Sequence, residues 1–304
     1  MSSFDIKKIP SQKGRIAIVT GANIGLGYET ALALAEKEMK VILACRNLEK
    51  ATKAKKEILG KVPNANLDII QLDLGQLESV HSFAKEFLAK YDQLDLLINN
   101  AGIMVPPFSL TKDGFESQMG VNYFAHFLLT KLLLDTIIKT PNSRIVSLSS
   151  NAHKRGKINF DDLQSKEKYS ALNAYCQSKL ACLIFAYELQ RRLEKVGAST
   201  ISVAAHPGVS DTNLAQYVSK WVMLFLGPIL RLTMIQSAEA GAEPTLYAAL
   251  GEDVKGGDYF GPSGWQEFKG RAKKVDSIPL SKDKAVAKRL WEVSEELTNI
   301  SFLS

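Results

Sequence analysis

The chain has 304 residues, of which 46% are hydrophobic and 23% charged, and its formal net charge is +6. This composition excludes an intrinsically disordered, collagen-like or repetitive protein, and it supplies enough apolar residues for a large core. The basic residues are spread along the whole chain without interleaved aromatic residues, so we expect no nucleic-acid partner.

The cysteine and histidine residues show no metal-binding spacing. None of the three cysteines forms a C-x-x-C pair, and none of the four histidines forms an H-x-x-x-H pair, so no metal site is predicted. The polar first 12 residues do not read as a signal peptide, and the apolar stretch 221–235 is too short and too broken to cross a bilayer. An odd number of thiols fits a reducing compartment, and we expect a cytoplasmic protein.

Short apolar segments alternate with longer segments of helical periodicity along the chain. We predict β-strands at residues 15–20, 40–44, 67–72, 94–99, 144–148, 200–205 and 259–260. We predict helices at residues 26–38, 48–59, 77–90, 112–139, 173–195 and 282–297. This alternation indicates a single α/β domain over residues 1–304, with a doubly wound, Rossmann-type parallel sheet of about seven strands and helices on both faces.

A glycine-rich turn joins the first predicted strand to the first predicted helix. It reads TGANIGLG over residues 20–27, a G-x-x-x-G-x-G pattern. Glycines let a backbone approach a pyrophosphate closely, and a helix N-terminus adds free N–H groups and a positive dipole. Glycine-rich turns also serve packing alone, but the position directly after the first strand favours a dinucleotide site.

The end of the second predicted strand indicates which dinucleotide is preferred. An NAD site places an acidic residue there to accept a hydrogen bond from the ribose 2′-hydroxyl. This chain instead reads LACRN over residues 43–47, without an acid and with Arg46. Because a guanidinium can meet a 2′-phosphate with two parallel donors, the sequence favours NADP(H) over NAD(H), although Arg46 can also be read as an ordinary surface residue.

Tyr175 and Lys179 form a Y-x-x-x-K pattern in a predicted helix. Residues four apart share one helix face, so the phenol and the ammonium can point into the same cleft. An ammonium stabilises the phenolate electrostatically, which lets Tyr175 exchange a proton with a carbonyl or alcohol oxygen near neutral pH. The pattern is weak alone and gains weight from its position after Ser149 and Ser150, which end the fifth strand.

Together these segments resemble the short-chain dehydrogenase/reductase family over about residues 13–300. The retinol dehydrogenase-like branch, which also includes WW-domain oxidoreductases and protochlorophyllide reductases, is the more similar part of that family. The similarity lies in LACR at 43–46, LINNAGIM at 97–104, SRIV at 143–146, AYCQSKLA at 174–181 and HPGV at 206–209. The 25-residue separation of Ser150 and Tyr175 is also similar to that branch.

The resemblance implies four catalytic residues. Ser150 would hold the substrate oxygen by a hydrogen bond, and Tyr175 would act as general acid and base. Lys179 would support the phenolate and bind the nicotinamide ribose hydroxyls. Asn122 would fix a water that links Lys179 to solvent.

The resemblance also implies a path for NADP(H). Asp73 would accept from the adenine amino group, and Asn100 and Gly102 would line the adenosine and ribose path. Thr212 would bind the nicotinamide carboxamide. The expected cofactor-binding residues are Gly21, Asn23, Ile24, Gly25, Gly27, Arg46, Asp73, Leu74, Asn100, Ala101, Gly102, Tyr175, Lys179, Pro207, Gly208, Val209 and Thr212.

Several of these residues have an alternative interpretation. Asn122 can be a helix side chain bonded to the backbone, and Asp73 can cap the following helix. Ser149 can replace Ser150 as the active hydroxyl. The apolar segment at about 213–236 fits a lid over a lipophilic substrate, a buried core or dimer helix, or a shallow membrane contact.

The sequence therefore predicts an NADP(H)-dependent oxidoreductase. It would transfer a hydride between nicotinamide and a lipophilic carbonyl or alcohol, such as a retinal-, steroid- or fatty-aldehyde-like substrate. A non-catalytic NADP(H)-binding regulatory protein on the same fold is the alternative, and a reductase of one pigment or steroid is a third interpretation. The resemblance implies a homodimer or homotetramer.

Overall fold

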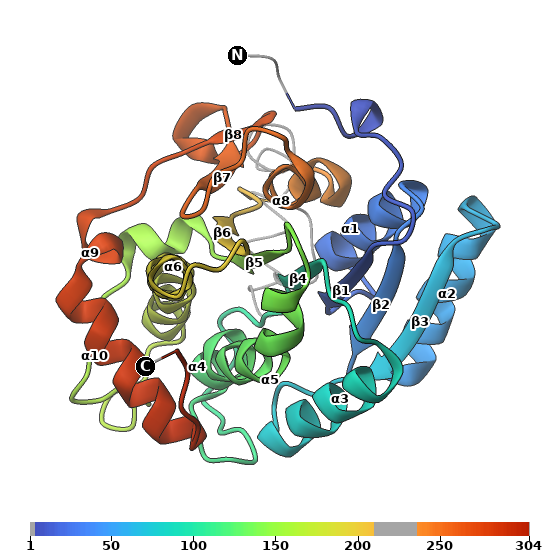
Figure 1. The fold of residues 1–304 in the computed structure, drawn as a ribbon. Helices are drawn as coiled ribbons and strands as arrows, with labels where there is room; N and C mark the ends of the chain where they lie inside the picture. The colour runs from blue at the N-terminus through green and yellow to red at the C-terminus, as the bar shows by residue number, and fades with distance from the viewer. Residues whose placement is uncertain (1–3, 210–235, 304) are drawn as a thin grey trace.

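An eight-stranded sheet runs through the computed structural model, which describes residues 4–209 and 236–303 (Figure 1). The strand order is β3-β2-β1-β4-β5-β6-β7-β8, and every pair is parallel except the last. The strands are β1 (Ile16–Thr20), β2 (Lys40–Cys45), β3 (Asn66–Gln71), β4 (Leu96–Asn99), β5 (Arg144–Leu148), β6 (Ile201–Ala205), β7 (Tyr259–Pro262) and β8 (Ala272–Lys274). The order reverses between β1 and β4, which is where doubly wound sheets bind ligands.

Helices cover both faces of this sheet. The helices are α1 (Gly25–Glu36), α2 (Leu48–Lys61), α3 (Leu77–Lys90), α4 (Ser117–Met119), α5 (Ala125–Lys139), α6 (Ala171–Lys195), α8 (Ala238–Leu250), α9 (Pro279–Lys282) and α10 (Lys284–Thr298). One hydrophobic cluster joins the sheet to α1, α2 and α8, and a second joins it to α3, α5, α6 and α10. The predicted doubly wound α/β architecture is confirmed.

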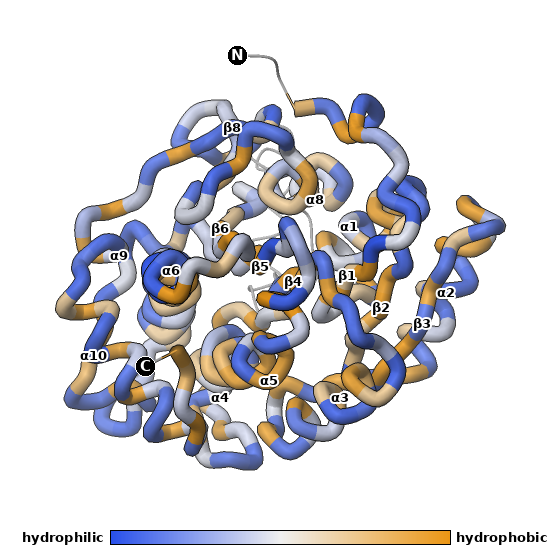
Figure 2. Tube along the Cα trace, viewed as in Figure 1, coloured by the Kyte–Doolittle hydropathy of each residue, from blue (hydrophilic) through white to orange (hydrophobic). Residues whose placement is uncertain are grey.

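Successive side chains of a central strand point to opposite faces of the sheet, which explains the two clusters. In β1, Ile18 belongs to the cluster under α5, whereas its neighbours Ala17 and Val19 belong to the cluster under α1. All three side chains are fully buried, because helices cover both faces. Figure 2 shows the result as mainly hydrophobic central strands inside a more hydrophilic rim of loops.

The sequence prediction missed β8, α8 and the four-residue helix α9. β8 pairs antiparallel with β7 and makes the sheet eight-stranded rather than seven-stranded. It has three residues, two of them exposed lysines, so it carries no apolar pattern. The helix α8 consists mainly of small apolar residues and contains Pro244, so it shows little helical periodicity, yet it packs beside α1 on the same face of the sheet.

The predicted helix at 112–139 begins later than expected. Glu116 accepts hydrogen bonds from the backbone N–H groups of Gln118 and Met119 and so starts α4 at Ser117. A π-helical turn, η2 (Gly120–Phe124), then joins α4 to α5. The continuous helical stretch Ser117–Lys139 is long and apolar enough to cross a membrane, but 67% of its most apolar window is buried, as in a core helix.

The second cluster is closed by an aromatic group that comes from distant parts of the chain. The Trp291 ring on α10 lies 5.1 Å from the Phe127 ring and 4.6 Å from the Phe302 ring. Its indole N–H donates to the Phe302 carbonyl at 3.1 Å, and the Arg192 guanidinium lies over its face. Trp291 therefore fastens α10 and the residues after it to α5 and α6.

We expect Trp291→Ala to lower the free energy of unfolding by about 3–5 kcal/mol, because it leaves a large cavity and an unpaired carbonyl. Chemical denaturation followed by circular dichroism measures this change. Trp265→Ala is the matched control, since Trp265 is 70% exposed and Trp291 only 1%. Equal losses for the two variants would contradict the packing role of Trp291.

Candidate functional site

The loops after the parallel strands carry most of the predicted site residues. Because the carboxyl ends of β1 to β6 meet at one edge of the sheet, these loops lie at one rim. The rim contains Gly21, Asn23, Ile24, Gly25 and Gly27 after β1, Arg46 after β2, Asp73 and Leu74 after β3, Asn100, Ala101 and Gly102 after β4, Ser150 after β5, and Pro207, Gly208 and Val209 after β6. Thr212 and the expected lid at about 213–236, apart from Gln236, lie outside the described residues.

The glycine-rich turn packs against the loop after β4. A Cβ on Gly27 would overlap the Gly21 carbonyl oxygen and would lie 2.5 Å from Asn100 Nδ2. No side chain caps the N-terminus of α1, where exposed Ile24 occupies the cap position. The turn therefore presents bare backbone and an uncapped helix dipole to this rim, which fits a pyrophosphate group.

Asn100 connects this turn to the sheet. Its Nδ2 donates to the Thr20 carbonyl at 2.7 Å, and its Oδ1 is buried without a hydrogen-bond partner in the described part of the chain. An unpaired buried amide oxygen costs free energy unless a ligand or water supplies a donor. This unpaired oxygen, next to an uncapped helix, fits the predicted adenosine and ribose path of a dinucleotide.

Arg46 lies just beyond the carboxyl end of β2 and is exposed. Gln71 Nε2 donates to its carbonyl at 3.0 Å, so its backbone is fixed by the neighbouring strand β3. β2 ends in Leu43, Ala44 and Cys45, all buried and none of them acidic. The position that would recognise a ribose 2′-hydroxyl therefore offers a cation.

Asp73 organises the turn before α3. Its Oδ1 accepts from the Gly75 N–H at 2.9 Å, and its Oδ2 accepts from Gln76 Nε2 at 2.9 Å. Gln76, not Asp73, occupies the N-cap position of α3, so the alternative interpretation of Asp73 as the helix cap is wrong. The adenine contact of Asp73 stays a prediction.

Tyr175 and Lys179 lie on adjacent turns of α6 and are both about 94% buried. The Ser170 hydroxyl starts this helix by accepting from the Asn173 N–H. The Lys179 ammonium donates to the Leu148 carbonyl at 3.1 Å and lies 6.0 Å from the centre of the Tyr175 ring. The structure thus brings the predicted phenol and ammonium together, at the carboxyl end of β5.

The Lys179 ammonium also reaches the loop after β4. A Cβ on Gly102 would lie 3.3 Å from Lys179 Nζ and 3.1 Å from Asn122 Oδ1. Three predicted residues from different segments therefore meet at one point, and a side chain at position 102 would crowd the other two.

The structure distinguishes between the two serines after β5. The Ser149 hydroxyl donates its one hydrogen to the Lys179 carbonyl at 2.7 Å, which ties this serine to the backbone of α6. The Ser150 hydroxyl accepts from the Ala152 N–H at 3.2 Å and keeps its own hydrogen for another acceptor. These contacts favour Ser150 as the hydroxyl that holds a substrate oxygen.

Asn122 lies in the π-helical turn η2, and its side chain bonds to protein groups. Its Oδ1 accepts from the Ile103 N–H at 2.8 Å, and its Nδ2 donates to the Ile103 carbonyl and to the Ser178 hydroxyl. The interpretation of its side chain as bonded to backbone is therefore confirmed. Its predicted part in fixing a water beside Lys179 stays a prediction.

The turn after β6 requires glycine. Gly208 has φ of +65°, and a Cβ there would overlap the Phe268 carbonyl oxygen. The next residue, Val209, donates its N–H to that same carbonyl at 2.8 Å. The Pro207-Gly208-Val209 turn is therefore fixed against a later segment of the chain.

His126 is a residue that the sequence analysis missed. Its Nδ1 lies 3.0 Å from the Asn122 carbonyl, and its Nε2 lies 3.0 Å from the Thr20 hydroxyl. A carbonyl only accepts, so Nδ1 carries the hydrogen and Nε2 accepts from Thr20. The Thr20 oxygen in turn accepts from the N–H groups of Asn100 and Ala101 at 2.9 Å each. His126 thereby joins the glycine-rich turn, the loop after β4 and the turn that holds Asn122.

The arrangement keeps His126 neutral. Its pKa is lowered to about 4, because burial and, to a smaller extent, the charge of Lys179 outweigh the hydrogen bond to the Asn122 carbonyl, which raises it. Its contact with Asn122 could have been predicted from the sequence, because His126 follows Asn122 by four positions on a helical segment. Its second partner, Thr20, is 106 residues away and gave no local signal.

We expect acid to destabilise the fold through His126. Its pKa is about 4 in the folded chain and 6.5 in the reference state, so the unfolded chain binds an extra proton between these pH values. The contribution of His126 to the free energy of unfolding is therefore fully present above pH 6.5, and it falls by about 3 kcal/mol as the pH drops to 4. Urea unfolding of His126→Gln over this range should show a shallower pH dependence.

His81→Gln is the matched control for this measurement, because His81 lies exposed on α3. This variant should keep the pH dependence of the unmodified chain. A His126→Gln variant with an unchanged slope would refute the buried neutral imidazole.

Known proteins with sequences similar to this chain belong to one family. The family described as short chain dehydrogenase matches residues 15–223. Retinol dehydrogenase 11 of Mus musculus is 42% identical over 291 residues, which cover 94% of this chain and 87% of that protein. Retinol dehydrogenase 13 of Homo sapiens is 43% identical over 292 residues, which cover 94% of this chain and 85% of that protein.

Solved structures agree with the fold. A protein of Mycobacterium paratuberculosis has a TM-score of 0.82 and 39% identity, and the match covers 99% of both chains. The RhlG protein of Pseudomonas aeruginosa, solved as an NADP active-site complex, has a TM-score of 0.66 at 20% identity, and the match covers 82% of this chain and 94% of that one. This chain is therefore an oxidoreductase of the short-chain dehydrogenase/reductase family, from its retinol dehydrogenase-like branch.

Proposed function

We propose that the protein reduces or oxidises a lipophilic carbonyl/alcohol pair with NADP(H). The observation that carries this proposal is the meeting of Tyr175, Lys179 and Gly102 beside the Leu148 carbonyl, on the rim that also holds the glycine-rich turn. A bound nicotinamide would supply the hydride, and the residues of the chain would supply orientation and the proton.

Each catalytic residue has a defined task in this proposal. Ser150 donates the hydrogen of its hydroxyl to the substrate oxygen and so orients it. Tyr175 gives a proton to that oxygen during reduction and takes one back during oxidation. The Lys179 ammonium, held by the Leu148 carbonyl, places a positive charge beside the Tyr175 ring.

The preference for NADP(H) rests on Arg46. An exposed guanidinium after β2 can bind a ribose 2′-phosphate with parallel hydrogen bonds, and the end of β2 offers no acid for a 2′-hydroxyl. Solved relatives include complexes with NADP and with NADH, so the residues of this chain decide its preference.

Exposed apolar side chains near Tyr175 support a lipophilic substrate. Leu172 lies one helical turn before Tyr175 and is 51% exposed. Phe108 is 46% exposed and contacts the ring of Tyr169, which precedes the same helix. The relatives named retinol dehydrogenases fit the same substrate class.

We expect Tyr175→Phe to reduce turnover of lipophilic aldehydes by at least about 100-fold, because the proton donor is lost. The affinity for NADPH should change little. NADPH oxidation measured at 340 nm and fluorescence titration of NADPH test the two statements. Tyr247→Phe is the control, since Tyr247 lies on α8, outside the proposed site, and its hydroxyl bonds to Asp253 in the loop after that helix. Unimpaired turnover in Tyr175→Phe would refute the assignment.

We expect Arg46→Ala to weaken NADPH binding by about 10- to 100-fold, the worth of a charge-assisted pair of hydrogen bonds. NADH binding should change by less than about 3-fold, because NADH has no 2′-phosphate. Fluorescence titration with both cofactors measures the difference. Lys56→Ala, which removes an exposed charge from α2, should leave both affinities unchanged. Equal losses for NADPH and NADH in Arg46→Ala would contradict the role of Arg46.

If the unmodified chain binds NADPH tightly and oxidises it with none of a panel of retinoid, steroid and fatty aldehydes, a regulatory NADP(H)-binding protein becomes the better description. The panel therefore separates the two interpretations that the sequence left open.

A further inference from the structure

We infer that Glu267 is a positioning residue that holds the loop of Ser150 and the Pro207-Gly208-Val209 turn in fixed register. This inference rests on the proposed function, in which the first loop orients the substrate oxygen and the second lies at the nicotinamide. Glu267 belongs to the connection between β7 and β8, which the sequence analysis did not associate with any function.

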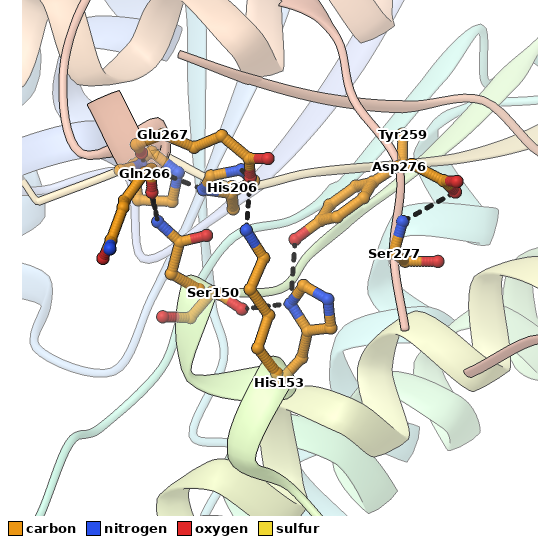
Figure 3. Close-up of polar contacts among 12 residues, drawn as sticks. Ser150, His153, His206, Tyr259, Gln266, Glu267, Asp276 and Ser277 are labelled. Atoms are coloured by element: carbon orange, nitrogen blue, oxygen red, sulfur yellow. Dashed lines mark hydrogen bonds and ion pairs between the residues drawn. The ribbon is translucent and has the colours of Figure 1, made fainter. Parts of the chain in front are cut away.

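The carboxylate of Glu267 contacts both loops at once. Its Oε2 lies 3.0 Å from Lys154 Nζ and 3.0 Å from His206 Nε2. Lys154 belongs to η3 (Asn151–Arg155), which starts directly after Ser150, and His206 directly precedes Pro207. Figure 3 shows the Glu267 side chain directed toward His206, while Ser150 and His153 belong to the other loop.

His206 passes this contact on to the turn after β6. The Gly208 N–H donates to His206 Nδ1 at 3.2 Å, so Nδ1 is the acceptor nitrogen of a neutral ring. Its Nε2 therefore carries the hydrogen that points at Glu267. The imidazole is completely buried, so one carboxylate fixes its tautomer and, through it, the Gly208 amide.

Residues 266–268, here called the clamp loop, also bond through their backbone to the loop of Ser150 and to the turn after β6. Asn151, the neighbour of Ser150, donates from Nδ2 to the carbonyls of Gln266 and Glu267 at 3.1 Å each. The Phe268 carbonyl accepts from the Val209 N–H at 2.8 Å. The clamp loop is thus bonded to each loop by backbone as well as by the Glu267 carboxylate.

The conformation of the clamp loop is held by its surroundings rather than by local preference. Gln266 and Glu267 have φ values of 49° and 57°, in the left-handed region that residues with a side chain rarely adopt. Such strain persists where surrounding contacts fix it, and it is concentrated at functional sites.

The charge state of Glu267 suits this task. Burial alone would raise its pKa, but hydrogen bonds from His206 and Lys154 outweigh burial and hold the pKa at about 2. The residue is therefore a carboxylate at neutral pH, and the two contacts are charge-assisted on its side.

The contacts of Glu267 matter for the reaction because reaction rates depend strongly on the relative positions of the reacting groups. Ser150 and the Pro207-Gly208-Val209 turn follow the neighbouring strands β5 and β6. The chain that connects them is long, because it includes the whole of α6. A misplacement of about 1 Å between reacting groups can cost about 100-fold in rate. Glu267 restricts the relative movement of these two loops, although it does not itself contact the reacting groups.

The test compares Glu267→Gln with Lys154→Met and with the double variant. We expect Glu267→Gln to lower kcat for a lipophilic aldehyde by about 10- to 100-fold, while KM and the Kd for NADPH change by less than about 3-fold. Because Lys154 acts through Glu267, the double variant should lose no more than Glu267→Gln alone. Glu292→Gln, which removes an exposed carboxylate paired with Lys288 on α10, is the matched control and should keep kcat.

A merely structural role predicts a different result. In that case kcat per folded molecule, with the folded fraction taken from circular dichroism, stays unchanged in Glu267→Gln, and this outcome overturns the inference. Additive losses in the double variant overturn it as well. If Glu267→Gln does not fold, Lys154→Met decides alone by the same division between kcat and KM.

A second measurement separates this inference from the proposed reaction. NADPH bound to the unmodified chain and to Glu267→Gln is compared by the fluorescence of its nicotinamide, which needs no turnover. An altered emission at unchanged affinity supports the clamp even if no aldehyde is reduced, whereas identical emission contradicts it. Failure of the unmodified chain with every aldehyde contradicts only the proposed function.

Discussion

The hydroxyl of Thr20 fixes the point where the sheet reverses its strand order. Its oxygen accepts hydrogen bonds from two backbone N–H groups after β4, and its hydrogen goes to His126. One small side chain on β1 therefore satisfies buried polar groups from the loop after β4 and from α5. The placement of the glycine-rich turn relative to Asn122, and through Gly102 to Lys179, depends on this junction.

Much of the fold could be predicted because strands buried on both faces read as continuous apolar runs, as in β1, β2 and β5. The prediction failed for elements whose sequences lack the hydrophobic periodicity that a helix or strand normally shows. The helix α8 is rich in small apolar residues and carries only a weak amphipathic signal, and β8 forms by pairing with β7 although two of its three residues are exposed lysines. The start of α4 depended on a carboxylate cap within a run that reads as one helix.

The candidate site divides in the same way. The glycine-rich turn and the pair Tyr175 and Lys179 are local patterns, and the structure brings the phenol and ammonium together. His126 and Glu267 act on partners 106 and 61 residues away, so no spacing in the sequence announces them. Both are residues whose neighbours are supplied by topology, and both connect segments that carry predicted catalytic or cofactor-binding residues.

The aromatic group around Trp291 has a consequence for synthesis of the protein. Phe127 and Phe185 are complete long before Trp291 and Phe302 leave the ribosome, since more than one hundred residues separate Phe185 from Phe302. At ordinary translation rates this interval lasts on the order of ten seconds. The nascent chain therefore exposes the apolar surface of α5 and α6 that Trp291 and Phe302 later cover, and chaperones that bind hydrophobic segments have this period in which to act.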